Sequence, residues 1–199
     1  MNRAEKKART RAALLQAARE RFSEDGYDGA TIRAIAAAAG VSTGSVHAHF
    51  PDKRALLLTC FQEQVDVAVA EGWASLARDA ALLDQLVHLA GFLYRSYAVH
   101  PALSRVMLQE SLFPSSAWTA VFSGQALSFL GQVAGLFRAA LERGELQRLP
   151  GEGALAARNF FAVYFLTLVA GLAGDPEHPE RWLADLRAAL AVQLQGLCD

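Results

Sequence analysis

Apolar residues recur at helical spacing along most of this chain, and the pattern predicts its secondary structure. Leu14, Leu15, Ala18 and Phe22 form one apolar stripe on a first helix, which we expect to end near Gly26. No segment alternates apolar and polar residues over the length of a strand with turn signals on both sides. The sequence therefore predicts an all-α fold.

Short elements with their own start and stop signals follow this first helix. Thr31 is a suitable N-cap for a short helix that Gly40 ends. Ser42 can cap a third, very short helix, which we expect to run to His49. A longer helix, Pro51–Ala77, is expected next, because proline favours the first position of a helix.

The rest of the chain predicts five further helices, separated by turn signals that include glycine and proline. Their expected ranges are Asp79–Val99, Ala102–Phe113, Ser116–Arg143, Glu152–Gly174 and Pro179–Leu197. The total is about nine helices. We expect them to form two domains, residues 1–54 and residues 55–199, joined near the start of the Pro51–Ala77 helix.

The most apolar stretch of the chain is the window Phe160–Gly174, which contains 15 residues and no charge. A helix that spans a membrane needs about 20 apolar residues. We therefore expect this window to form a buried or interface helix, and we expect no membrane partner.

The composition indicates a folded protein from a reducing compartment. Of its 199 residues, 53% are hydrophobic and 20% are charged, which excludes intrinsic disorder. Its two cysteines, Cys60 and Cys198, show no CxxC spacing and cannot form a disulfide framework. The basic N-terminus is not followed by the apolar stretch of a secretory signal, so we expect a cytoplasmic location.

Charge is distributed unevenly along the chain. Residues 1–54 contain 10 Lys and Arg against 6 Asp and Glu, whereas residues 55–199 contain 9 against 14. A basic N-terminal segment on an acidic body suggests that a polyanion binds one end of the protein.

The segment Thr31–Phe50 has the layout of a helix-turn-helix. Ala36 is small enough to let two helices cross closely, and Gly40 supplies the turn between them. The following short helix then presents small and polar side chains that can enter a major groove. These residues are Thr43, Gly44, Ser45 and His47.

Lys53 lies in the expected first turn of the next helix, where a cation opposes the helix macrodipole. A phosphate bound there would receive both the lysine charge and the free N–H groups of the helix start. The alternative is a solvated lysine whose position costs a few tenths of a kcal/mol.

The spacing of many residues in this region resembles the TetR family of bacterial transcriptional regulators. The matching residues are Thr10, Arg11, Leu14, Leu15, Ala17, Ala18, Phe22, Gly26, Tyr27, Thr31, Ile32, Ile35, Ala36, Ala39, Gly40, Val41, Ser42, Gly44, Ser45, Val46, His49, Phe50, Lys53 and Leu56. The resemblance covers about residues 10–56, a quarter of the chain.

The resemblance implies a homodimer with two N-terminal DNA-binding heads and a C-terminal bundle, usually a repressor that a small-molecule effector releases from a palindromic double-stranded DNA operator. The residues that this assigns to DNA are Thr31, Arg33, Thr43, Gly44, Ser45, His47, His49 and Lys53. His47 stands where the family usually has tyrosine, so we expect tighter DNA binding at low pH. For His49, a phosphate contact and a structural hydrogen bond both remain open.

The C-terminal part is rich in aromatic side chains, which fits either an apolar ligand pocket or ordinary packing. We place the candidate pocket for a hydrophobic or aromatic effector at Tyr97, Met107, Trp118 and Phe122. The last two helices are the expected dimer surface, although an intramolecular core would use the same residues. These residues are Phe161, Tyr164, Phe165, Leu168, Leu183, Leu186, Leu190 and Leu194.

An enzyme is the main alternative class of protein. The sequence contains no P-loop, GxGxxG, GxSxG or HExxH motif, so we predict no catalytic residue and no cofactor. A metal site at His47 and His49 is disfavoured because an i,i+2 spacing directs the two rings to different faces of a helix. The alternative function is a helical protein that binds a ligand, or acts as an enzyme, without sequence-specific DNA binding.

Overall fold

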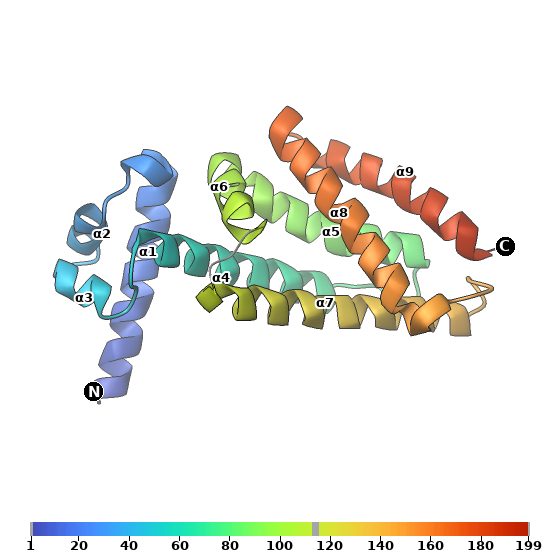
Figure 1. Ribbon diagram of the computed structural model, residues 1–199, viewed down its shortest axis with the longest axis horizontal. Coiled ribbons are helices and arrows are strands. Elements are labelled where there is room, and N and C mark those ends of the chain that lie inside the picture. Colours follow the sequence, from blue (N-terminus) through green and yellow to red (C-terminus); the bar gives the residue numbers. More distant parts are fainter. Residues whose placement is uncertain (1, 113–115, 199) are drawn as a thin grey trace. The chain divides into compact units, whose positions relative to one another are not determined.

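The computed structural model describes the backbone of residues 2–112 and 116–198, with the side chains of 110–112, 116–123, 125 and 198 left out. This part of the chain contains nine α-helices, one 3-10 helix and no strand (Figure 1), which confirms the all-α prediction. The helices are α1 (Arg3–Gly29), α2 (Ile32–Ala38), α3 (Thr43–His47), α4 (Lys53–Ala74), α5 (Leu82–Ala98), α6 (Pro101–Leu112), α7 (Ser116–Glu142), α8 (Ala154–Gly174) and α9 (Pro179–Cys198). The 3-10 helix η1 (Pro150–Gly153) precedes α8.

The chain divides into two compact units. The first comprises Met1–Val67 and Ala102–Gln109, and the second comprises Ala68–Pro101 and Glu110–Asp199. The expected boundary at residue 54 lies at the start of α4, whereas the first unit continues for about four turns of that helix. The reason is packing, because the first half of α4 is almost entirely buried.

In the first unit, α1 contacts α2, and the Cys60 thiol of α4 donates to the Leu15 carbonyl oxygen of α1. The predicted apolar stripe of α1 is buried. Leu14 and Ala18 have no exposed surface, and Phe22 is 1% exposed. The helix continues to Gly29 rather than ending at Gly26, but Gly26 has a non-helical backbone with a φ of 70°. The predicted end is therefore a kink that only glycine adopts without strain.

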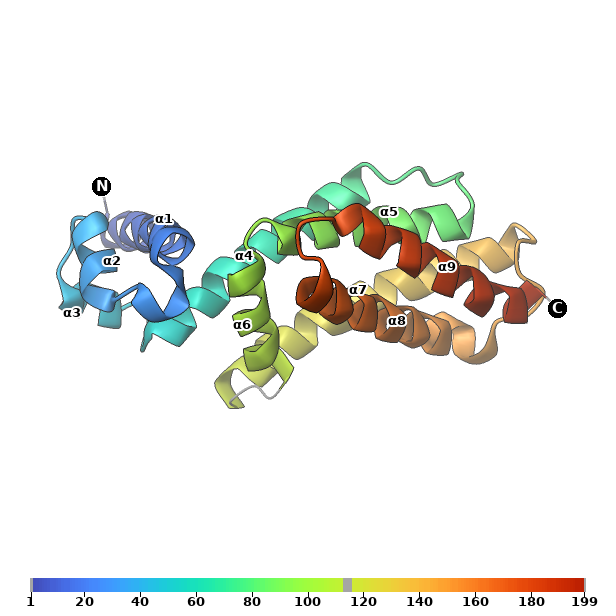
Figure 2. The ribbon, with the colours of Figure 1, turned by 90° about the horizontal axis from the view of Figure 1, so that it is seen from above.

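The second unit is a helical bundle in which α5 contacts α9, and α8 contacts both α7 and α9 (Figure 2). Its centre is aromatic. The Tyr94 and Tyr164 rings stack with centroids 5.2 Å apart, and the Tyr94 hydroxyl donates to the Tyr164 carbonyl oxygen at 2.9 Å. Trp182 meets the Tyr94 ring edge-on and leaves no space for a side chain at Gly171, where an added Cβ would lie 2.5 Å from the indole. These contacts hold α5, α8 and α9 together.

The helix α8 is apolar on both of its faces. Phe160 and Leu168 on one face are fully buried, whereas Leu166 on the other face is 70% exposed. By length and composition the segment Pro150–Gly174 could cross a membrane, although the core helix of a water-exposed protein meets the same criteria. Here α8 packs against α7 and α9 within the second unit.

Candidate nucleic-acid interface

The turn between α2 and α3 is fixed by its caps. The Thr31 hydroxyl accepts a hydrogen bond from the Ala34 N–H at the start of α2, as predicted. Gly40 then adopts a left-handed conformation with a φ of 67°, which a residue without a side chain tolerates best. At the start of α3, the Ser42 hydroxyl accepts from the Ser45 N–H at 3.2 Å. The predicted caps on both helices are thus confirmed.

One buried apolar side chain, Val46, packs α3 against the rest of the unit. Val46 is fully buried, α3 contacts α2, and the α2 residues Ile35 and Ala36 are buried as well. The helix is shorter than predicted, because it ends at His47 with Ala48 as its C-cap. With Val46 turned inward, helical spacing directs the other side chains of α3 to solvent. Thr43, Gly44 and His47 are exposed, and Ser45 is half-buried.

Two further candidate residues lie on α2 and its cap. Thr31 and Arg33 are both exposed. The Thr31 hydroxyl already serves as the N-cap, so a phosphate contact would use its remaining donor capacity. Arg33 has no ion pair within the described part of the chain, and its guanidinium is therefore free to meet an anion.

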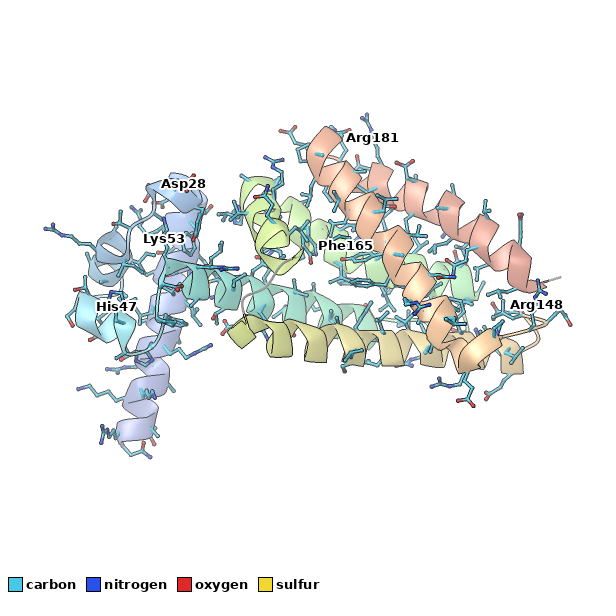
Figure 3. The ribbon with its side chains drawn as sticks, viewed as in Figure 1. Asp28, His47, Lys53, Arg148, Phe165 and Arg181 are labelled. Atoms are coloured by element: carbon cyan, nitrogen blue, oxygen red, sulfur yellow. The ribbon has the colours of Figure 1, made fainter. Side chains whose placement is uncertain are left out.

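His47 is held in one orientation by the chain that follows it. Its Nδ1 lies 3.2 Å from the carbonyl oxygen of Pro51. Figure 3 labels His47 on α3. A carbonyl only accepts hydrogen bonds, so Nδ1 must carry the proton for this bond to form. The Nε2 of the neutral ring is then an acceptor, and only the protonated ring offers a second N–H to a phosphate.

His49 lies in the turn after α3 rather than on it. Its side chain is half-buried, and its ring centroid is 6.3 Å from that of Phe50, which is 4% exposed. Of the two roles left open by the sequence, this position favours the structural one.

The ammonium of Lys53 forms hydrogen bonds to backbone carbonyls that the sequence did not predict. Its Nζ donates to the carbonyl oxygens of Tyr27 at 2.6 Å and Ala30 at 3.0 Å, with Asp28 O at 3.4 Å. It also lies 4.4 Å from the centre of the Tyr27 ring. The last carbonyls of a helix lack intrahelical partners and carry its negative dipole end, so a cation is favoured there.

The N-terminal end of α4 is formed differently from the prediction. The helix begins at Lys53 rather than Pro51, and the Asp52 carboxylate accepts from the Ala55 N–H at 2.7 Å. An aspartate is a better N-cap than the preceding proline, because it supplies the acceptor that the first N–H groups need. Lys53 does sit in the first turn, as predicted, but its ammonium reaches back to the end of α1.

Only two of the four residues of the candidate effector pocket have side chains among the described residues. Tyr97 is 9% exposed in the second unit, and Met107 is 2% exposed in the first. Burial raises the pKa of Tyr97 to about 12, and its hydroxyl is hydrogen-bonded with that of Tyr164. The side chains of Trp118 and Phe122 lie outside the described residues. The pocket remains a prediction.

The structure corrects the set of residues assigned to the dimer surface. Five of the eight are buried within the protomer and form its core, so they cannot also cover a partner. They are Tyr164 at 4% exposure, Leu168, Leu186 and Leu190 at 0%, and Leu194 at 9%. The apolar period on α8 and α9 reflected intramolecular packing, which was the alternative left open. Phe161, Phe165 and Leu183 are half-buried. Figure 3 labels Phe165 among the side chains of the second unit.

A different row of apolar side chains on these two helices is exposed. On α8 it includes Leu155, Leu166 and Val169, which are 44%, 70% and 39% exposed. On α9 it includes Val192, which is 70% exposed and follows the exposed Ala188 by one turn. A sequence signal for this row was present, since α8 carries more apolar residues than one buried face can accommodate.

Among the described residues, no group of three or more His, Cys, Asp or Glu side chains is placed to hold a metal ion. The arrangement of α2 and α3 is that of a helix-turn-helix unit, whose second helix reads DNA in proteins of this class.

Comparison with known proteins shows which proteins the N-terminal part of the chain resembles. Residues 14–60 match the model for bacterial regulatory proteins of the tetR family. The HTH-type transcriptional repressor Rv1474c of Mycobacterium tuberculosis is 40% identical over 88 residues, which cover 42% of this chain and 47% of the relative. The chain thus spans about half the length of that relative. The HTH-type transcriptional repressor NicS of Pseudomonas putida is 29% identical over 148 residues, 68% of this chain and 69% of NicS.

The likeness of fold extends over nearly the whole chain. The TetR-family repressor FadR of Thermus thermophilus, solved in complex with lauroyl-CoA, superposes with a TM-score of 0.73 and 27% identity, covering 94% of both chains. Residues 14–60 thus carry an N-terminal domain of the tetR type, and the chain has the fold of the TetR-family repressor FadR.

Replacing Lys53 by methionine tests its role at the end of α1. The variant keeps the aliphatic stem but leaves the carbonyls of Tyr27 and Ala30 without their charged donor. We expect the free energy of unfolding to fall by about 1 to 2 kcal/mol, which thermal denaturation of the free protein would detect. Lys7→Met is the matched control, because Lys7 is exposed and has no hydrogen-bond partner among the described residues. Equal melting temperatures for the two variants would rule out the capping role.

Proposed function

We propose that this protein is a homodimeric transcriptional repressor that binds a palindromic DNA operator and is released by a small hydrophobic effector. The observation that carries the proposal is the exposed surface of α3, formed by Thr43, Gly44 and His47. The buried side chain of Val46 holds this helix in place, and the turn at Gly40 precedes it. A short helix with small exposed side chains can approach base edges closely in a major groove. DNA as the target also implies a cytoplasmic location.

The effector proposal combines composition with one structural relative. The centre of the second unit is built from aromatic and aliphatic side chains, the usual lining of a site for an apolar ligand. FadR of Thermus thermophilus was solved with lauroyl-CoA. We therefore propose a hydrophobic carboxylic acid or its thioester as the first effector class to examine.

The dimer proposal rests on the exposed apolar row of α8 and α9. Leu166, Val169 and Val192 are large apolar side chains that solvent covers in the single chain. Burying such a row against its symmetry mate removes apolar surface from water on both protomers at once. Small neighbours such as Ala188 would let the helices approach closely.

Selection of DNA by the wild-type protein tests the proposed function directly. Incubation with a random-sequence duplex library, followed by recovery and sequencing, should enrich one motif with two inverted half-sites. Lauroyl-CoA, laurate and free coenzyme A are then added separately to the complex. Release by lauroyl-CoA alone identifies a thioester effector, and release by laurate identifies the free acid. Failure to enrich any motif would refute sequence-specific binding.

The dimer surface is tested by the double variant Leu166→Glu and Val192→Glu. Both side chains are 70% exposed in the protomer, so the fold should persist while four carboxylates face one another across the symmetry axis. Sedimentation velocity at micromolar concentration should show a dimer for the wild type and a monomer for the variant. Leu127→Glu is the control, since Leu127 is 67% exposed on α7, and it should remain dimeric. A variant that still dimerises would exclude this surface.

The geometry of His47 predicts that its ring contributes to DNA binding. Its Nδ1 bonds to the Pro51 carbonyl oxygen, which ties the end of α3 to the chain that follows and leaves Nε2 as the ring nitrogen that a phosphate can reach. The His47→Ala variant loses both contacts, so we expect its affinity for operator DNA to fall about five- to tenfold, the effect of one hydrogen bond, as fluorescence anisotropy would measure. An unchanged affinity in this variant would contradict the assignment.

A further inference from the structure

The positive charge of the DNA-binding segment is concentrated on its first eleven residues. Arg3, Lys6, Lys7, Arg9 and Arg11 face a single carboxylate there, that of Glu5. Residues 12–54 contain five cations and five carboxylates. Residues 12–54, which include the helix-turn-helix, are thus formally neutral, although non-specific affinity for DNA comes almost entirely from cations that neutralise phosphates.

The cations outside this segment mostly have other partners. Arg19 pairs with Glu63 at 2.5 Å, and Arg21 pairs with Glu24 and Asp25 of its own helix. Lys53 is bound to the carbonyls at the end of α1. These cations are at least partly compensated within the unit and contribute little net field to a phosphate.

Four of the N-terminal cations are unpaired. Arg3, Lys6, Lys7 and Arg9 are exposed, and no ion pair engages them within the described part of the chain. Arg11 is shared, because its guanidinium bonds to Glu63 at 2.9 Å. The four free cations are therefore available to an external anion.

The segment that carries them is an ordered helix rather than a loose tail. Asn2 and Glu5 form a reciprocal capping box that starts α1. The buried stripe begins only at Leu14, so the eleven residues before it extend over about 16 Å without covering any core. Figure 1 shows these N-terminal turns of α1 running past the level of α3.

The periodicity of α1 places two of the four free cations on one face. Arg3 and Lys7 lie in one row of the helix with Leu14, spaced by four and seven residues, whereas Lys6 and Arg9 lie on other faces of the exposed turns. Leu14 is fully buried, so this row lies on the face of α1 that packs against the rest of the unit. Over about 16 Å, one strand of duplex DNA presents four to five phosphates.

A phosphate backbone fits this surface better than a lipid membrane does. A helix that lies on a membrane needs large apolar side chains on the face opposite its cations. Between Asn2 and Ala13 the apolar residues are alanines alone. The segment offers charge without an apolar face, which matches a polyanion in water.

We propose that Arg3–Arg9 form a helical arm that binds the phosphate backbone of DNA beside the groove that α3 enters, and supplies most of the electrostatic attraction. The arm rests on the proposed function, because it adds phosphate contacts to the base contacts of α3. It carries no sequence information itself, so it acts on operator and random DNA alike.

The test compares two variants that lose the same charge from different places. The arm variant carries Lys6→Gln, Lys7→Gln and Arg9→Gln, and the control carries Arg78→Gln, Arg95→Gln and Arg138→Gln in the second unit. Binding to a random-sequence duplex of about 40 base pairs is measured by fluorescence anisotropy between about 50 and 200 mM salt. Glutamine is a good helix former, and circular dichroism checks that α1 remains helical.

Each phosphate contact contributes about −0.9 to the slope of log affinity against log salt. The arm variant loses three cations from each protomer, so it should lose two to three units of slope per bound protomer, and its affinity at low salt should fall about a hundredfold or more, while the control keeps the wild-type slope. Equal slopes in the two variants would overturn the arm. Binding of both variants to vesicles of anionic lipid is measured as well. If the arm variant loses affinity for the vesicles while its DNA slope is unchanged, the arm binds a membrane and the proposal is overturned. Whether the wild type and the arm variant still enrich one inverted-repeat motif decides the proposed function separately.

Discussion

The hydrogen bonds of Lys53 to the end of α1 fix the geometry on which the DNA-binding unit depends. They join the last carbonyls of α1, at Tyr27 and Ala30, to the first turn of α4. The intervening chain contains α2 and α3, so this one ammonium closes the loop that holds both helices. His47 adds a second tie, from α3 to the carbonyl of Pro51. These polar contacts hold the chain before and after α3, and the buried side chain of Val46 anchors the helix itself to the unit.

This arrangement also explains a cation in an unfavourable sequence position. A lysine in the first turn of a helix opposes that helix's dipole. The negative end of α1 lies within reach of the same ammonium, and the aromatic face of Tyr27 adds a favourable contact. Its stabilisation by α1 offsets the unfavourable dipole of α4. The apparent signal for phosphate binding therefore has a structural cause.

In the second unit, α8 is apolar on two faces, of which one is buried and the other is exposed. One face of α8 fills the aromatic core with Phe160, Tyr164 and Leu168, and the other exposes Leu166 and Val169. A helix that is apolar all round is stable only when both faces find apolar neighbours. The core supplies neighbours for one face within the chain. The exposed face is the reason that we infer a second protomer rather than a longer intramolecular core.

The sequence by itself determined the helices, the caps at Thr31 and Ser42, and the helix-turn-helix between them. These features depend on neighbours within a few residues, and local hydrogen bonds and periodicity specify them. It also determined the charge of the N-terminal arm. The tertiary structure alone decided which apolar face of α8 is core, and it gave Lys53 its partners 23 and 26 residues away. Helical periodicity marks a face as apolar without saying what covers it, because that depends on how distant helices pack.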